Sequence, residues 1–107
     1  MLAKENRIRL EKEYQYIFRN SKKIKTIYFD FYLNNCDSPT PKFGIIVSNK
    51  YGNAVKRNKI RRQIRAIIRT DLLQKNQNKQ IIIQIKPEAS SLSFSKIKEI
   101  LLTQLAI

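Results

Sequence analysis

The first part of the chain carries apolar residues at helical spacing. Between Asn6 and Arg19 these residues are Leu10, Tyr14, Ile17 and Phe18, with Lys and Glu between them. Residues three or four positions apart share one face of a helix, so the pattern predicts an amphipathic helix over this range.

The pattern then changes to alternation between Ile24 and Leu33, which predicts a strand. Its faces carry Ile27, Phe29, Phe31 and Leu33 on one side and Tyr28, Asp30 and Tyr32 on the other. A turn-forming segment, Asn34–Pro41, leads to a second short apolar strand, Phe43–Ser48. We expect these two strands to pair as an antiparallel hairpin.

Helical spacing returns over Ala54–Leu73. The apolar stripe of this segment consists of Ile60, Ile64, Ile67 and Ile68. The polar stretch Gln74–Lys79 is predicted to be a loop. The segment Gln80–Ile85 is predicted to be a strand of the buried type that ends before Pro87. A last helix is predicted to begin near Ser93, a residue type favoured at helix N-caps.

The order helix, two strands, helix, strand, helix favours an α+β fold in which helices cover a sheet. The chain has 107 residues, of which 42% are hydrophobic, and this predicts one domain over residues 1–107. The order of the strands in the sheet does not follow from the pattern.

The net charge indicates what kind of partner the chain binds. Twenty-two Lys and Arg against eight Asp and Glu give a net charge of +14, the balance expected of a protein that binds phosphates. A membrane surface is the competing polyanion. The chain has no apolar run of the roughly 18 residues that a membrane span needs, and Met1–Leu10 is too charged for a signal peptide, so we expect a cytoplasmic protein.

The chain offers little for catalysis by its own side chains. It has no His, its acidic residues are scattered, and Cys36 has neither a second Cys nor a His with which to bind zinc. We therefore predict no catalytic residue, no protein-bound metal ion or cofactor, and an ordinary free thiol at Cys36.

Basic residues gather where acidic residues are absent, between Asp37 and Asp71. They are Lys42, Lys50, Lys56, Arg57, Lys59, Arg61, Arg62, Arg65 and Arg69. At about 100° per residue, one arc of the helix beside the Ile stripe carries Asn58, Arg61, Arg62, Arg65 and Arg69. Guanidinium groups bind phosphates through two hydrogen bonds and stack on bases, which favours RNA over a merely solvated basic face. Charge alone does not separate RNA from DNA.

The run from Phe43 to Arg65 closely resembles the signature of the bacterial ribonuclease P protein subunit. A strand leads through Gly-Asn-Ala-Val, at residues 52–55, into a basic helix whose family hallmark is Arg-Asn-Arg. Here the hallmark is Arg57-Asn58-Lys59, and Asn49 stands where the family often has Lys. Lys59 cannot make the bidentate hydrogen bonds of an Arg to RNA but can still bind a phosphate. The resemblance covers nearly the whole chain.

This resemblance implies a two-layer α-β sandwich with a central sheet and αβββαβα order. It further implies one extra short strand and the left-handed βαβ crossover of the second domain of ribosomal protein S5. The implied activity is the removal of the 5′ leader of precursor tRNA by a holoenzyme whose RNA subunit, with bound Mg²⁺, performs phosphodiester hydrolysis. The implied partners are the RNA subunit and precursor tRNA, and neither DNA nor a membrane.

The implied site has two parts. The part that binds the RNA subunit comprises Lys50, Asn53, Lys56, Arg57, Asn58, Lys59, Arg61, Arg62, Arg65 and Arg69. The part that binds the leader comprises Tyr14, Phe18 and Tyr32, with Tyr28 as a further candidate. The spacing of Tyr14 and Phe18 by itself favours core packing, whereas the alternation predicts that Tyr32 faces outward.

Two points stay open. A regular helix from Ala54 places Arg57 on the Ile side, so either the core does not reach the first turn or the helix begins later. A ribosomal or general RNA-binding protein of similar fold is the alternative function. A protein-only nuclease would need an acidic metal-binding cluster, which the sequence does not show.

Overall fold

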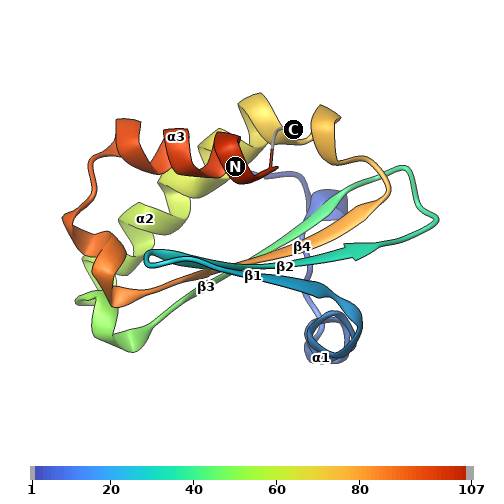
Figure 1. Ribbon diagram of the computed structural model, residues 1–107, viewed down its shortest axis with the longest axis horizontal. Helices are drawn as coiled ribbons and strands as arrows, with labels where there is room; N and C mark the ends of the chain where they lie inside the picture. Colours follow the sequence, from blue (N-terminus) through green and yellow to red (C-terminus); the bar gives the residue numbers. More distant parts are fainter. Residues whose placement is uncertain (1, 106–107) are drawn as a thin grey trace.

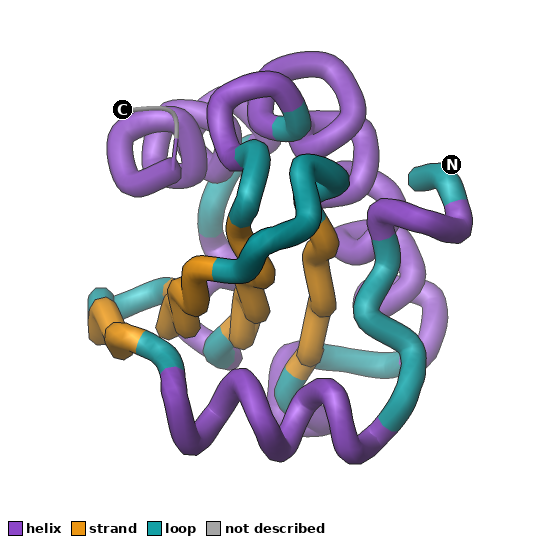
Figure 2. The backbone as a smooth tube through the Cα atoms, turned by 90° about the vertical axis from the view of Figure 1, so that its right-hand side faces the viewer, coloured by secondary structure: helices purple, strands orange, loops and turns teal. Residues whose placement is uncertain are grey.

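The computed structural model describes residues 2–105 and has a four-stranded sheet with helices on both faces (Figure 1). The strands are β1 (Lys22–Lys25), β2 (Phe29–Asn35), β3 (Lys42–Val47) and β4 (Lys79–Ile85). The helices are α1 (Glu11–Asn20), α2 (Ala54–Ile67) and α3 (Phe94–Leu105). Helices α2 and α3 form a layer on one face, and α1 runs along the opposite face (Figure 2). The predicted α+β fold is confirmed.

The sheet has the order β1-β2-β4-β3, so the predicted hairpin between the second and third strands is wrong. Strand β4 lies between them, antiparallel to β2 and parallel to β3. The reason is burial: Ile81, Ile82, Ile83 and Ile85 are all fully buried. A strand that is apolar on both faces is stable only in the middle of a covered sheet. Helix α2 therefore lies within a crossover between two parallel neighbours, β3 and β4.

The predicted strand Ile24–Leu33 is two strands joined by a tight turn. The hydroxyl of Thr26 accepts a hydrogen bond from the N–H of Phe29 at 3.0 Å and donates one to its carbonyl at 2.6 Å. Ile27, predicted on the core face, lies in this turn and is 70% exposed. The extra short strand that the family resemblance implies is therefore β1.

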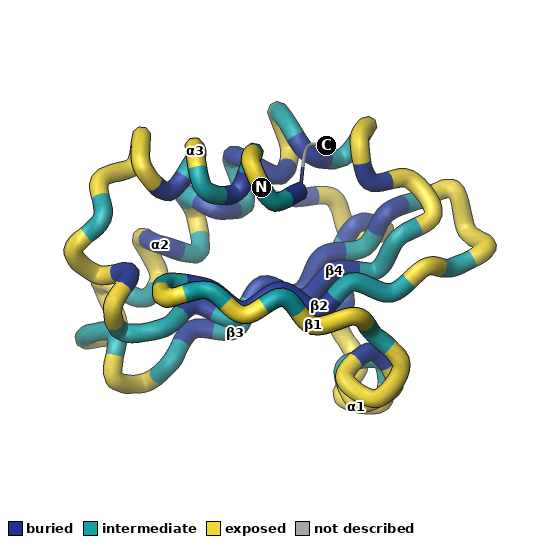
Figure 3. The backbone as a smooth tube through the Cα atoms, viewed as in Figure 1, coloured by how far each residue is buried: buried dark blue, intermediate teal, exposed yellow. Residues whose placement is uncertain are grey.

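Two apolar cores lie on opposite faces of the sheet (Figure 3). The main core lies between the sheet and the α2/α3 layer, and includes Phe29, Phe31, Ile60 and Ile64. The small core lies under α1 and consists of Ile8, Ile17, Tyr32 and Ile82. Alternation along β2 and β4 supplies both cores, since neighbouring residues point to opposite faces.

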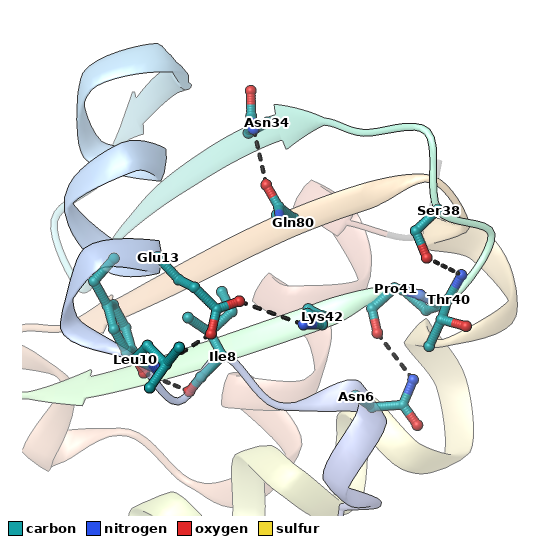
Figure 4. Close-up of polar contacts among 11 residues, drawn as sticks. Asn6, Ile8, Leu10, Glu13, Asn34, Ser38, Thr40, Pro41, Lys42 and Gln80 are labelled. Carbon is teal, nitrogen blue, oxygen red and sulfur yellow. Dashed lines mark hydrogen bonds and ion pairs between the residues drawn. The ribbon is translucent and has the colours of Figure 1, made fainter.

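The first helix begins later than predicted, at Glu11. Asn6 is buried instead, and its side-chain amide donates to the carbonyl of Pro41 at 2.9 Å (Figure 4). The N–H of Leu10, just before the helix, is bound by the Glu13 carboxylate at 3.2 Å. The predicted N-cap of the last helix is confirmed, because the Ser93 hydroxyl accepts the N–H of Lys96 at 3.2 Å.

Candidate nucleic-acid interface

Helix α2 holds the basic residues in a fixed arrangement. Its start is capped by Asn53, whose side-chain oxygen accepts the N–H of Lys56 at 3.0 Å. Its buried residues are Ile60, Ile64 and Ile67, so the predicted apolar stripe is confirmed. Because this stripe faces the core, the charged side chains are divided between its two flanks.

The structure explains how Arg57 can lie on the Ile side of α2. The helix does begin at Ala54, but its first buried residue is Ile60, so the core does not reach the first turn. The half-buried Arg57 folds back, and its guanidinium donates to the carbonyl of Gly52 at 2.8 Å. This contact joins the loop before α2 to the helix.

One flank of α2 is an arginine surface. The side chains of Arg62, Arg65 and Arg69 line a hollow of about 440 Å³ whose remaining lining residue is Ala66. Arg61, on the same side, donates to the Asn58 side-chain oxygen at 3.0 Å. Arg69 lies in the wider turn Ile68–Leu72 that continues the helix. We call Arg62, Arg65 and Arg69 the arginine cradle.

The charge of α2 is not neutralised within the part of the chain that the structure describes. The ion pairs of residues 2–105 are Lys42–Glu13, Lys86–Asp30, Lys96–Glu99 and Lys98–Asp71. None of them involves a basic residue of α2. Unpaired, closely spaced guanidinium groups repel one another, and an external polyanion relieves that repulsion.

The other predicted residues lie in the first two turns of α2 or just before the helix. Lys56 and Lys59 are exposed on its opposite flank. Lys50 is exposed in the short turn Asn49–Tyr51, which precedes the helix. Asn53 is occupied as the N-cap, so its structural role is shown directly by its hydrogen bond. Basic residues therefore occupy both flanks of α2 and the turn before it.

Three of the four predicted aromatic residues, Tyr14, Phe18 and Tyr32, gather around α1, but not all of them are exposed. Tyr14 is half-buried, and its hydroxyl donates to the carbonyl of Ile8 at 3.3 Å. Burial raises the pKa of Tyr14, the charge of Glu13 raises it further, and Arg65 opposes the rise. Phe18 is 39% exposed and, with Tyr14, lines an open hollow of about 350 Å³. The other residues of that hollow are Arg9, Glu11 and Ile46.

The exposed position predicted for Tyr32 is wrong. Tyr32 does point away from the main core, but α1 covers it and leaves it 9% exposed. The Phe18 ring meets it edge-on, with 4.7 Å between the ring centroids. The ammonium nitrogen of Lys23 lies 5.1 Å from the centre of the Tyr32 ring. Sequence reasoning missed Lys23, which the register of β1 against β2 places opposite Tyr32.

Tyr28 packs on the opposite face of the sheet from Tyr32, whereas the alternation predicted that the two residues share a face. It lies in the turn between β1 and β2 and packs, half-buried, against the main core. The turn interrupts the period of two, so Tyr28 falls on the opposite side of the sheet. The structure therefore separates Tyr28 from the other three aromatic residues.

The arginine cradle and the aromatic hollow meet around the edge strand β3. Arg65 from α2 and Tyr14 from α1 line one small cavity, about 80 Å³ in volume, together with Arg7. Arg7 and Arg9, which precede α1, were not predicted as site residues. Their signal was only their charge and their place beside the first helix. A single extended ligand could contact both surfaces.

Comparison with known proteins places these features in a family. A family model described as Ribonuclease P matches residues 2–106. The ribonuclease P protein component of Syntrophus aciditrophicus is 33% identical over 96 residues, which cover 90% of this chain and 81% of the relative. That of Mycoplasma mycoides is 35% identical over 91 residues, which cover 84% of each chain.

Solved structures agree with the sequence comparison. The ribonuclease P protein of Thermotoga maritima superposes with a TM-score of 0.82 at 26% identity, covering 92% of this chain and 94% of that chain. A Staphylococcus aureus ribonuclease P protein, a mutant with defective mRNA degradation activity, gives a TM-score of 0.82 at 30% identity. It covers 94% of this chain and 88% of that chain.

Proposed function

The chain belongs to the ribonuclease P protein family, and from this premise we propose that it is the protein subunit of ribonuclease P in the bacterial cytoplasm. Membership of the family implies a role in tRNA 5′ processing. The finer division of that role between the chain's two surfaces is our proposal. As for a membrane, no helix within residues 2–105 has the length and apolar character to span one.

The basic residues of α2 bind the RNA subunit in this proposal. The observation that carries it is the arginine cradle, in which three Arg side chains line one hollow and form no ion pair within the described residues. Arg is suited to phosphate because its planar group donates two parallel hydrogen bonds. Arg57 and Asn53 hold the start of the helix and act mainly by positioning it.

The leader of precursor tRNA binds along the aromatic hollow. Phe18 offers the exposed ring on which a base can stack, and Arg9 beside it can meet a phosphate. Tyr32 supports Phe18 from beneath, and Lys23 already covers the Tyr32 ring. In this proposal the stacking role therefore belongs to Phe18 rather than to Tyr32.

The RNA subunit, in this proposal, binds the Mg²⁺ ions of the holoenzyme and performs the hydrolysis. The support is that residues 2–105 hold no group of three or more His, Cys, Asp or Glu side chains placed to bind a metal ion. Glu13 pairs with Lys42 at 3.3 Å, and Asp30 pairs with Lys86 at 3.1 Å. Magnesium prefers free carboxylate and phosphate oxygens, and RNA supplies phosphates in abundance. The chain's own contribution is to bind and orient the two RNAs.

Reconstitution tests the proposal. The chain is mixed with the matching RNA subunit and precursor tRNA at low Mg²⁺, where added protein should accelerate removal of the leader. The absence of any acceleration would contradict the proposed function. Cleavage without the RNA subunit would indicate a protein-only nuclease instead. Sedimentation of the native chain with ribosomal subunits at high salt would favour the alternative of a ribosomal protein.

A further inference from the structure

Helices α2 and α3 both begin at one end of the helical layer (Figure 1). A second basic and aromatic hollow is lined by residues at and just before these two helix starts. Its volume is about 540 Å³, within the range of small-ligand sites. The residues that line it are Tyr51, Lys56, Lys59, Ile60, Gln63, Ser90, Leu92, Ser93 and Phe94. No carboxylate is among them. It lies on the flank of α2 opposite the arginine cradle.

Three side chains at this hollow, those of Lys56, Lys59 and Phe94, are exposed and free to meet a ligand. Phe94 is 42% exposed, and the aromatic pairs within residues 2–105 involve neither Phe94 nor Tyr51. Lys56 and Lys59 are exposed, and neither is in an ion pair of the described residues. Burial raises the pKa of Tyr51, which keeps its phenol protonated and able to donate.

This combination matches the parts of one nucleotide. An exposed ring offers a stacking surface to a planar base, and the ammonium groups of Lys56 and Lys59 suit the phosphates on either side of it. The half-buried Gln63 can donate to and accept from a base edge. Ile60 and Leu92 form an apolar wall of the hollow. This wall favours binding of an aromatic ring over binding of charged groups.

We propose that this hollow binds one unpaired base of RNA, stacked on Phe94 and flanked by phosphates at Lys56 and Lys59. The proposal rests on the proposed function and extends the interface from α2 to the start of α3. The RNA subunit and precursor tRNA are the two candidate sources of the base, because each is RNA and each would approach the basic helix.

Tryptophan fluorescence tests the stacking directly. The chain contains no Trp, so Phe94→Trp places a single indole in the hollow. Its fluorescence should be quenched on titration with the RNA subunit or with precursor tRNA, each added alone, and the arm that quenches identifies the source. The control is Ile27→Trp in the exposed turn before β2, where quenching should be small. Binding of both RNAs to Phe94→Trp without quenching of its indole would overturn the proposal.

Affinity measurements give a second test. Loss of one base–aromatic stack should weaken binding by about 5- to 160-fold, so Phe94→Ala and Phe94→Leu should both lose affinity while Phe94→Tyr retains it. Thermal unfolding checks that each variant folds, and Ile27→Ala is the matched loss of an exposed apolar side chain. Wild-type affinity in Phe94→Ala would overturn the base site alone. Failure of the wild-type chain to bind the RNA subunit would instead overturn the proposed function and this site with it.

Discussion

The ring of Tyr14 lies directly against the backbone of Gly44, so that a Cβ atom at residue 44 would lie 2.7 Å from the tyrosine Cε1 and hydroxyl oxygen. Gly44 has no positive φ, so Ala is not strained there by the backbone itself. We expect Gly44→Ala to lower the free energy of unfolding by about 1–3 kcal/mol through overpacking. Urea denaturation measures this change.

A double-mutant cycle isolates the cause. In a Tyr14→Ala background the clash is gone, and Gly44→Ala should be neutral or stabilising by up to about 1 kcal/mol, because it restricts the unfolded chain. An equal destabilisation in both backgrounds would show that Tyr14 does not set the requirement for glycine.

The arginine cradle predicts a particular salt dependence. Removing one phosphate-binding side chain should flatten the slope of log affinity against log salt by about 0.7–0.9, so Arg62→Ala, Arg65→Ala and Arg69→Ala should each reduce the slope for the RNA subunit. Filter binding over a range of salt concentrations measures it. Lys75→Ala removes an exposed charge elsewhere and should leave the slope nearly unchanged. Equal slopes in all four variants would remove these arginines from the interface.

Phe18 and Tyr32 should respond differently to truncation. Phe18→Ala should weaken the affinity for precursor tRNA by about 1–3 kcal/mol, with a small effect on stability because the ring is partly exposed. Tyr32→Ala should chiefly destabilise the fold, because it empties the small core under α1. Substrates with and without a leader separate the effects. If Phe18→Ala weakens both substrates equally, the leader does not stack there.

The start of α1 should depend on pH through Glu13. Burial alone would raise its pKa, but hydrogen bonds from the Leu10 N–H and from Lys42 outweigh burial and lower it. A carboxyl with a lowered pKa stabilises the fold above its ordinary pKa, and this contribution disappears as the pH falls through the folded value. Glu13→Gln should therefore be less stable than wild type at pH 7, by up to about 1 kcal/mol, and equally stable in acid.

The matched control for this prediction is Glu11→Gln, in the same helical turn. Glu11 is exposed and makes no ion pair within residues 2–105. Its replacement should give a much smaller difference between pH 7 and acid. A pH-independent effect of Glu13→Gln would show that the Lys42 pair contributes nothing measurable.

Asn76 should be important for stability although it has no place in the RNA surface. It is 1% exposed, and its amide donates to the carbonyls of Leu72 at 2.8 Å and Leu105 at 3.0 Å, which joins the end of the α2 segment to α3. Asn76→Ala should destabilise the fold by about 1–3 kcal/mol, because two buried carbonyls lose their partner. RNA affinity of the folded fraction should be unchanged, and both quantities are measured on the same preparation.

Local pattern predicted the elements well but not their neighbours. The Ile stripe of α2 and the cap at Ser93 follow from spacing and residue type, and both are confirmed. The predicted hairpin is wrong because it followed from the closeness of the two strands in sequence, whereas the burial of β4 decides which strands pair. The run Ile81–Ile83 is apolar at consecutive positions, and this signal already required a neighbour on each side and a cover on each face.

The candidate site shows the same limit. The arginine cradle could be predicted because a helix fixes which residues share a flank. The exposure of Tyr32 could not be, because it depends on where α1 returns to the sheet, which no local period encodes. The turn at Thr26 did have a local signal, a hydroxyl that can bind the backbone three residues on, but the uninterrupted alternation of apolar residues masked it.

The position of β4 has a consequence for synthesis. Because the middle strand is the last of the four to be made, β2 and β3 expose unpaired edges, and α2 has no finished sheet to cover, until residue 85 has been translated. Docking of this strand joins contacts that are distant in sequence, a slow kind of step in folding. A nascent chain of this protein therefore carries its basic helix, unsupported, before β4 can join the β1–β2 pair to β3.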